Sequence, residues 1–205
     1  MPIIAIAGLT GSGKNYTAKH IAQKLGFTHF YPSFKDYLGD FGFNNVVEFQ
    51  QAVLEAQQDN FTSSTHQKLK NFDHDFDLKL ITQVQVALSQ GKGVVLSTWL
   101  GPWLDEVSQQ LVQLKLIDQP IKIDYKLFLE STIENRAQRI IHRDETIEMA
   151  IPQIIDYINL KEENNYLRFK YIYQLDITLH DDLIQIDADK YQDETRIKLI
   201  LDKLD

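Results

Sequence analysis

The hydrophobic pattern of the chain alternates between short runs that are apolar at nearly every position and longer segments with apolar residues every three or four positions. The first run is Ile-Ala-rich and covers residues 3–7. A run that is apolar on both faces predicts a strand inside a sheet. Apolar residues then recur at helical spacing over residues 18–25, and Gly26 follows as a helix stop. The chain therefore begins with a strand, a loop and a helix.

The same alternation continues to the end of the chain. Further strands are predicted at residues 93–97, 121–129 and 183–187. Helical patterns lie between and around them, at residues 44–57, 77–90, 103–116, 131–142, 146–173 and 192–204. Pro152 falls early in its segment, where the missing N–H would have no hydrogen-bond partner within the helix, so it need not break the helix. Strands separated by helices of this length form βαβ units, so we predict an α/β fold with a mostly parallel sheet covered on both faces.

Residues 34–71 carry no clear strand pattern and predict a helical insertion between the second and third strands. An acidic cluster, Asp73 to Asp77, follows at the expected start of the next helix. Such a cluster could hold a metal ion, but acidic residues at a helix start also cap free N–H groups and interact with the dipole. We favour the capping interpretation.

Composition narrows the classes of function. The chain has 205 residues without a linker-like stretch, which predicts one domain. A formal charge of -8 disfavours binding of nucleic acid through phosphate neutralisation and favours small ligands. The absence of cysteine excludes disulfides and thiolate metal sites. Neither a membrane-spanning apolar run nor a signal-peptide pattern is visible, so we expect a cytoplasmic protein without a membrane partner.

A glycine-rich loop lies between the first strand and the first helix. Its sequence, Gly-Leu-Thr-Gly-Ser-Gly-Lys-Asn, covers residues 8–15. Glycines let successive backbone N–H groups turn toward phosphate oxygens, and the helix N-terminus adds its positive dipole end. The usual Ser or Thr that binds magnesium is replaced by Asn15, so Mg²⁺ is expected to be held mainly by nucleotide and water. The predicted ATP-binding residues are Gly8, Thr10, Gly11, Ser12, Gly13, Lys14, Asn15 and Tyr16.

Beyond this loop, the whole chain resembles the archaeal-type cytidylate kinases, a family of P-loop nucleoside-monophosphate kinases. The resemblance rests on the loop itself, on Ala-Lys-His-Ile-Ala-Gln-Lys-Leu-Gly at residues 18–26, on Phe76-Asp77, on Val94-Val95-Leu96 with Trp103, and on three C-terminal motifs. These motifs are Glu-Asn-Arg-Ala-Gln-Arg-Ile at 134–140, Lys-Glu-Glu at 161–163, and Arg-Phe-Lys-Tyr-Ile-Tyr at 168–173 with Asp176.

This resemblance implies a P-loop kinase fold with a central parallel five-stranded sheet flanked by helices. It also implies that residues 34–71 form an acceptor-binding insertion and that residues 136–161, approximately, form a lid. The implied reaction is transfer of the terminal phosphoryl group of ATP, with Mg²⁺, to CMP or dCMP.

Several cations are candidates for the charge neutralisation that phosphoryl transfer requires. Arg136, Arg139 and Arg143 are spaced to lie on one helical face. This stripe could also be a solvated basic surface. The catalytic candidates are Lys14, Arg139, Arg143 and Arg168, and Lys161 stands where the family tends to have arginine.

The acceptor side departs from the family pattern. The third strand of the family ends in a carboxylate followed by an acceptor-binding arginine, whereas residues 97–99 are Ser-Thr-Trp. We predict an acceptor in the cleft between the insertion and the end of the third strand, in contact with Lys35, Asp77 and Trp99. Lys161 is a further predicted acceptor-binding residue. Trp99 and Trp103 could stack on a base, although buried core tryptophans are more common.

Three functions remain open at this point. The first is an ATP-dependent kinase of CMP, dCMP or a related nucleoside monophosphate. The second is a kinase of the same fold with another small-molecule acceptor. The third is a nucleotide-binding regulatory protein without turnover, suggested by Asn15 together with Ser97.

Overall fold

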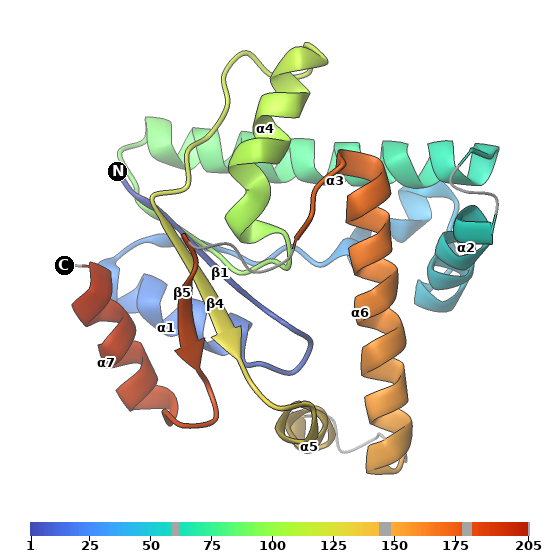
Figure 1. Cartoon of the computed structure of the whole chain (residues 1–205). Coiled ribbons are helices and arrows are strands. Elements are labelled where there is room, and N and C mark those ends of the chain that lie inside the picture. The colour runs from blue at the N-terminus through green and yellow to red at the C-terminus, as the bar shows by residue number, and fades with distance from the viewer. Residues whose placement is uncertain (59–61, 144–148, 178–181, 205) are drawn as a thin grey trace.

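A five-stranded parallel sheet forms the centre of the molecule in a computed structural model that describes residues 1–58, 62–143, 149–177 and 182–204 (Figure 1). The strand order is β2-β3-β1-β4-β5, and every pairing is parallel. The predicted α/β fold and its five parallel strands are confirmed. The strands are β1 (Ile3–Gly8), β2 (Thr28–Phe30), β3 (Val94–Leu96), β4 (Tyr125–Glu130) and β5 (Ile184–Asp187).

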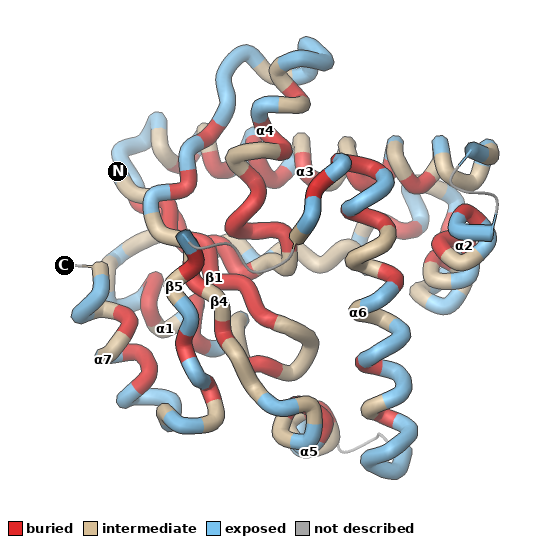
Figure 2. The backbone as a smooth tube through the Cα atoms, viewed as in Figure 1, coloured by how far each residue is buried: buried red, intermediate tan, exposed pale blue. Residues whose placement is uncertain are grey.

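Strand β1 is buried along its whole length, as its continuous apolar run predicts (Figure 2). Ile4 and Ile6 join the core beneath α1 (Lys14–Leu25) and α7 (Asp193–Leu204). Ile3 and Ala5 face the opposite core, which includes residues of α3 (Ser64–Ser89) and α4 (Leu104–Gln113). Alternate side chains of one strand thus serve both faces of the sheet. Among the residues that the structure describes, no helix is long and apolar enough to cross a membrane.

The segment between β2 and β3 is helical, in agreement with the predicted absence of strands. It consists of the 3-10 helix η1 (Phe34–Phe41), α2 (Val46–Gln58) and the first turns of α3. The predicted start of the third helix at residue 77 is wrong, because α3 already begins at Ser64. The Ser63 hydroxyl caps it by accepting a hydrogen bond from the His66 N–H at 3.3 Å. Asp73 and Asp77 therefore lie inside the helix, and our capping interpretation of the acidic cluster is also wrong.

Two helices follow β4 at the carboxyl edge of the sheet. Helix α5 (Ile133–Arg143) lies just beyond the end of β4, and α6 (Ile151–Tyr173) runs alongside the core toward the insertion (Figure 1). Pro152 lies in the first turn of α6, as predicted. The expected lid, residues 136–161, includes residues 144–148, which lie outside the described part of the chain.

The remaining boundaries differ by a few residues from the predicted ones. Strand β4 begins at Tyr125 rather than at residue 121. Ile121 and Ile123 are buried, which explains the strand-like alternation, but the N–H of Ile121 bonds to the hydroxyl of Ser108 at 3.0 Å instead of a neighbouring strand. A short 3-10 helix, η2 (Gly101–Trp103), precedes α4.

Candidate functional site

The glycine-rich loop follows β1 directly and leads into α1. Gly13 is the N-cap of α1 with φ 89°, and Gly11 has φ 86°, both in the left-handed region that favours glycine. A Cβ on Gly11 would lie 2.6 Å from the carbonyl oxygen of Arg136, so α5 packs directly on the loop. The Ser12 hydroxyl is buried, and no described residue bonds to it. The loop thus presents backbone N–H groups and a helix N-terminus, the arrangement that binds phosphate.

Four cations from four different elements form a connected group that begins at this loop, because Lys14 interacts with Arg143 and Lys161, and Lys161 interacts with Lys35. Lys14 begins α1, Lys35 lies on η1, Arg143 ends α5 and Lys161 lies on α6. Burial, assisted by the charges of Lys161, Arg143 and Arg136, lowers the pKa of Lys14 to about 8, against the opposing effect of Glu162. Burial and the charges of Lys35 and Arg143 likewise lower the pKa of Lys161. Mutual repulsion of this kind is typical of a site built for an anion.

A carboxylate in this cationic site ties α6 to the glycine-rich loop. Glu162 Oε1 accepts a hydrogen bond from the N–H of Thr10 at 3.0 Å and pairs with Arg136 Nη1 at 2.5 Å. Arg136 Nη1 also donates to the carbonyl oxygen of Thr10 at 3.3 Å. Arg136 belongs to the predicted basic stripe and Glu162 to the Lys-Glu-Glu motif, but neither residue was predicted to be part of the site. In the structure, both residues bond to Thr10 and so attach α5 and α6 to the loop.

Arg139, on α5, contacts the segments that follow β4 and β5. Its guanidinium pairs with Asp189 at 2.8 Å and also donates to the hydroxyl of Ser131. Although burial acts in the other direction, hydrogen bonds from Ser131, the Thr132 N–H, Asn135 and Arg139 lower the pKa of Asp189 well below its usual range. About a third of the Arg139 side chain remains exposed, so its guanidinium can still reach a ligand.

A polar hollow of about 860 Å³ adjoins this pair, and we call it the loop hollow. Its walls come from the glycine-rich loop, from α1, and from the segment between β5 and α7. They include Ser12, Gly13, Tyr16, Arg139, Asp189 and Gln192. The hollow therefore lies on the face of the sheet that α1 and α7 cover.

Two predicted site residues, Arg168 and Asp77, lie in a buried network between α3 and α6. Arg168 is 6% exposed and its Nε lies 3.1 Å from Asp73 Oδ2. Asp77 is 3% exposed and accepts a hydrogen bond of 2.5 Å from the Tyr173 hydroxyl. Burial raises the pKa of Asp73 to about 6, and burial with repulsion by Asp73 raises the pKa of Asp77 to about 7. This placement argues against direct contact of Arg168 or Asp77 with a substrate.

The end of β3 has neutral polar groups where the family has charged ones. The Ser97 hydroxyl and His29 Nε2, on neighbouring strands, are hydrogen-bonded at 2.9 Å. Trp99 is half-buried and its ring lies 6.0 Å from that of Phe169, whereas Trp103 is 2% exposed and packs in the core. The core interpretation thus holds for Trp103, while Trp99 remains partly accessible.

A second, mainly apolar cavity of about 660 Å³ lies beside these two residues. We call it the tryptophan cavity. Its walls include Leu9, Trp99, Trp103, Phe128, Glu130 and Ile177. Neither Lys35 nor Asp77 lines it, so the structure does not bring Trp99 together with the other two predicted acceptor contacts.

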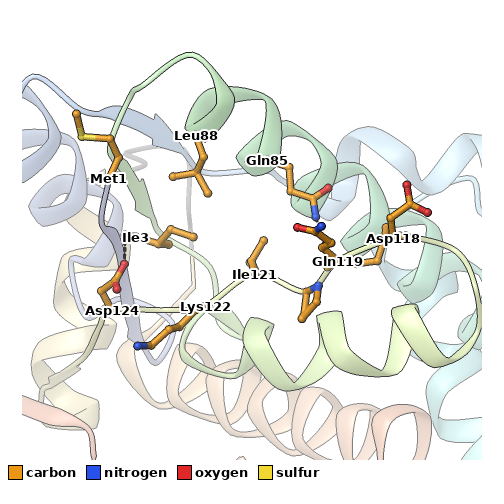
Figure 3. Close-up of a pocket in the computed structure, with 11 residues that line it drawn as sticks. Met1, Ile3, Gln85, Leu88, Asp118, Gln119, Ile121, Lys122 and Asp124 are labelled. Carbon is orange, nitrogen blue, oxygen red and sulfur yellow. Dashed lines mark hydrogen bonds between the residues drawn. The ribbon is translucent and has the colours of Figure 1, made fainter.

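A third hollow, of about 670 Å³, lies at the opposite edge of the sheet (Figure 3). It is lined by residues that include Ile3, Gln85, Ile121 and Asp124, whose carboxylate accepts a hydrogen bond from the Ile3 N–H at 2.8 Å. Ile3 begins β1 and the glycine-rich loop follows its other end. This hollow is therefore separate from the phosphate site. Among the described residues no group of three or more His, Asp or Glu side chains could hold a metal ion.

Comparison with known proteins supports the predicted resemblance. The chain is 26% identical over 208 residues to the cytidylate kinase of Methanocaldococcus jannaschii, covering 99% of this chain and 97% of that protein. It is also 26% identical over 180 residues to the cytidylate kinase of Ignicoccus hospitalis, covering 86% of this chain and 83% of that protein. No protein-family model matches the chain.

Solved structures support the fold. The deoxyadenosine kinase of M. mycoides with bound dATP superposes with a TM-score of 0.54 at 18% identity, covering 100% of this chain and 99% of that one. An uncharacterized protein from Eubacterium ventriosum gives 0.55 at 13% identity, covering 99% and 97%. The chain therefore has the P-loop kinase fold, and it is similar over nearly its whole length to phosphotransferases that act on nucleotides.

Proposed function

We propose that this protein transfers the terminal phosphoryl group of ATP to a nucleoside monophosphate, with CMP and dCMP as the first candidates. The observation that carries the proposal is a group of neighbouring cations from four elements, in which Lys14 of the glycine-rich loop interacts with Arg143 and Lys161, and Lys161 interacts with Lys35. Two phosphate-bearing substrates bring several negative charges to one place. Four cations from four elements are suited to neutralise these charges and to align the attacking and leaving oxygens.

In the proposed reaction, loop N–H groups and Lys14 hold the β- and γ-phosphates of the donor. Arg143 and Lys161 stabilise the charge that spreads over the transferred group, and Lys35 holds the acceptor phosphate. The donor base is assigned to the loop hollow, because Ser12 and Gly13 of the phosphate loop line it and Tyr16 and Arg139 offer a ring and a guanidinium for stacking.

The end of β3 favours a phosphate over a hydroxyl group as the nucleophile. A hydroxyl nucleophile gains from a general base that removes its proton, and in this chain Ser97 stands at the strand end where a carboxylate could do so. A phosphate monoester is already ionised near neutral pH, so its transfer reaction requires no such base. The acceptor is therefore a nucleotide rather than a nucleoside in our proposal.

Magnesium fits this site as part of the nucleotide substrate. The amide oxygen of Asn15 is the protein's candidate ligand, since the Ser97 hydroxyl already bonds to His29 and the described residues form no carboxylate cluster. When bound, Mg²⁺ would neutralise donor phosphate charge. We propose that the chain's own cations supply the rest of that neutralisation.

A coupled assay for ADP release tests the proposal. ATP and magnesium are combined in turn with CMP, dCMP, UMP, AMP, GMP and the corresponding nucleosides. We expect turnover with at least one monophosphate and none with the nucleosides. Turnover only with nucleosides or with non-nucleotides would refute the proposed acceptor class.

The loss of a magnesium-binding hydroxyl at Asn15 and of a carboxylate at Ser97 also favours a second candidate function, nucleotide binding without turnover. Calorimetry separates this function from the first. ATP binding without ADP release, over the whole acceptor panel and with several divalent ions, would support a regulatory nucleotide-binding protein.

The substitution Lys35→Ala tests the proposed role of Lys35 in acceptor binding. If Lys35 holds the acceptor phosphate as a point charge, this substitution raises the acceptor's KM and leaves the KM for ATP almost unchanged. Lys92→Ala is the matched control, because Lys92 is exposed and lies just before β3, at the edge opposite the loop. Equal effects of Lys35→Ala on both substrates would remove Lys35 from the acceptor site.

A further inference from the structure

The phosphate loop separates two cavities that lie on opposite faces of the sheet. The loop hollow touches the loop at Ser12 and Gly13 and lies on the side of α1 and α7. The tryptophan cavity touches the loop at Leu9 and lies on the side of α4. Trp103 and Phe128 belong with the core of that second face. A kinase needs room for two substrates on either side of its transferred phosphate, and these cavities provide it.

We propose that the tryptophan cavity binds the planar base of the phosphoryl acceptor, an inference that rests on the proposed function. The cavity lies beyond the carboxyl ends of β1, β3 and β4, the edge at which open parallel sheets bind their ligands. Its volume of about 660 Å³ is ample for a nucleoside. Leu9 in its wall precedes Thr10, whose N–H is held by Glu162 next to Lys161. One acceptor can thus place its base in the cavity beside Leu9 and its phosphate near Lys161, on the other side of Thr10.

The lining favours an aromatic ligand. Trp99, which follows β3, and Phe128 of β4 contribute two half-buried aromatic side chains, and the buried Trp103 also lines the cavity. Stacking of a base on such side chains contributes about 1–3 kcal/mol per base in single-stranded nucleic-acid complexes. The buried indole Nε1 of Trp99 has no hydrogen-bond partner among the described residues. A small movement of the ring toward a ligand acceptor would satisfy it.

One lining group adds a preference among bases. Glu130 carries the sole charge in the described lining of the cavity, and it forms no ion pair with a described residue. Phe128 and Glu130 are two positions apart on β4 and therefore project to the same face. A carboxylate accepts hydrogen bonds but donates none, and we assign it to the exocyclic amino group of the base. Cytosine and adenine carry such a group, whereas uracil does not.

The chain contains its own probe for this cavity, because its two tryptophans both line it. Tryptophan emission of the whole protein is titrated with CMP, AMP, UMP and inorganic phosphate, with free tryptophan amide as the control for absorption by the nucleotides. We expect a saturable change with CMP and AMP, a weaker affinity for UMP, and no response to phosphate. Trp99→Phe should remove most of the response, since Trp99 is the more exposed of the two rings.

Glu130→Gln tests the preference. The neutral amide both donates and accepts, so we expect the ratio of CMP to UMP affinity to fall about tenfold, the effect of losing one hydrogen bond to a charged group. The donor's KM should stay constant. Glu134→Gln is the matched control, because Glu134 is exposed on α5 four residues later. An unchanged ratio in Glu130→Gln would overturn the assignment of Glu130.

The two proposals can fail separately. If the ADP-release assay shows turnover of a monophosphate that leaves tryptophan emission unchanged, the acceptor base lies elsewhere and the kinase function stands. An equal response to inorganic phosphate would also overturn the cavity assignment, because the signal would then come from the phosphate site. If CMP changes the emission saturably but no monophosphate of the panel is phosphorylated, the cavity is a ligand site and the kinase proposal fails.

Discussion

Lys14 is the residue on which donor binding depends most directly in the proposed site. Its burial, together with the charges of Lys161, Arg143 and Arg136, lowers its pKa to about 8. Lys14→Ala removes a charge that acts on phosphate rather than on the core, so we expect turnover to fall about a hundredfold or more. The melting temperature should stay close to that of the wild type. Lys19→Ala, on the exposed side of α1, is the control. An unchanged rate would mean that this loop does not bind the donor.

The charge on Lys14 also makes a pH dependence testable. Protonated Lys14 binds phosphate, so the affinity for ATP should fall as pH rises through about 8 in the unliganded protein. The groups that face it are Lys161, Arg143 and Arg136, which lower its pKa, and Glu162, which raises it. Glu162→Gln removes the single raising charge, so this fall should move to lower pH.

Calorimetric ATP affinities over the neutral and alkaline range measure that shift. Glu163→Gln is the control, because Glu163 is exposed on the next position of α6. A merely structural role of Glu162 would weaken ATP binding equally at every pH. A midpoint that does not move would therefore contradict the electrostatic role.

Residues that act through distant partners were the ones that sequence reasoning missed. The phosphate loop could be predicted because its chemistry lies in eight consecutive residues. Arg136 and Glu162 meet Thr10 from positions 126 and 152 residues away, and no local pattern indicates that contact. Arg168 was selected by its motif, yet its guanidinium is buried beside Asp73 and over the rings of Phe49 and Phe169.

At the scale of elements, helices α3 and α6 are joined by a network that no local pattern could predict. The hydrogen bond between Tyr173 and Asp77 joins residues 96 positions apart. Strands and helices were predictable because periodicity is local and strong. The start of α3 was not, because its first turns are polar up to Leu69 and because the acidic run resembles a cap. Asp73 and Asp77 are buried because α6 packs against this part of α3.

Asp77→Asn tests the cost of this network. Burial and the neighbouring Asp73 raise the pKa of Asp77 to about 7, against the opposing hydrogen bond from Tyr173 and the charge of Arg168. The unfolded chain ionises this carboxyl near its ordinary, lower pKa, so the folded protein binds more protons between the two values. The free energy of unfolding contributed by Asp77 is therefore full at low pH and is lost as pH rises through about 7.

An amide at position 77 can still accept from the Tyr173 hydroxyl but never ionises. We expect the melting temperature of Asp77→Asn, relative to the wild type, to increase between acidic and mildly alkaline pH, by a few degrees. Asp75→Asn is the control, because Asp75 lies on the same helix but is exposed and pairs with Lys79. A difference that stays constant with pH would show that Asp77 does not titrate in this range.

At the scale of the molecule, charge is unevenly distributed. The chain carries a formal charge of -8, yet Lys14, Arg143 and Lys161 lie near one another at one loop, and Lys35 lies near Lys161. Net charge predicted a small ligand instead of nucleic acid, and motif spacing predicted several of these cations. Their convergence depends on how η1, α5 and α6 pack around the sheet. Sequence patterns specify the elements but not their distances.

This convergence predicts how the whole molecule responds to a ligand that spans both cavities. The four cations repel one another, and they belong to four elements, so a single polyanion would remove the repulsion and join these elements. We expect a dinucleoside polyphosphate with adenosine at one end and cytidine at the other to raise the melting temperature more than ATP and CMP added together, because one association replaces two. The excess should shrink as KCl is raised, since salt screens exposed charges. Lys35→Ala should remove most of the excess while the shift with ATP alone remains. A shift no larger than that with ATP alone would show that the two cavities do not serve one reaction.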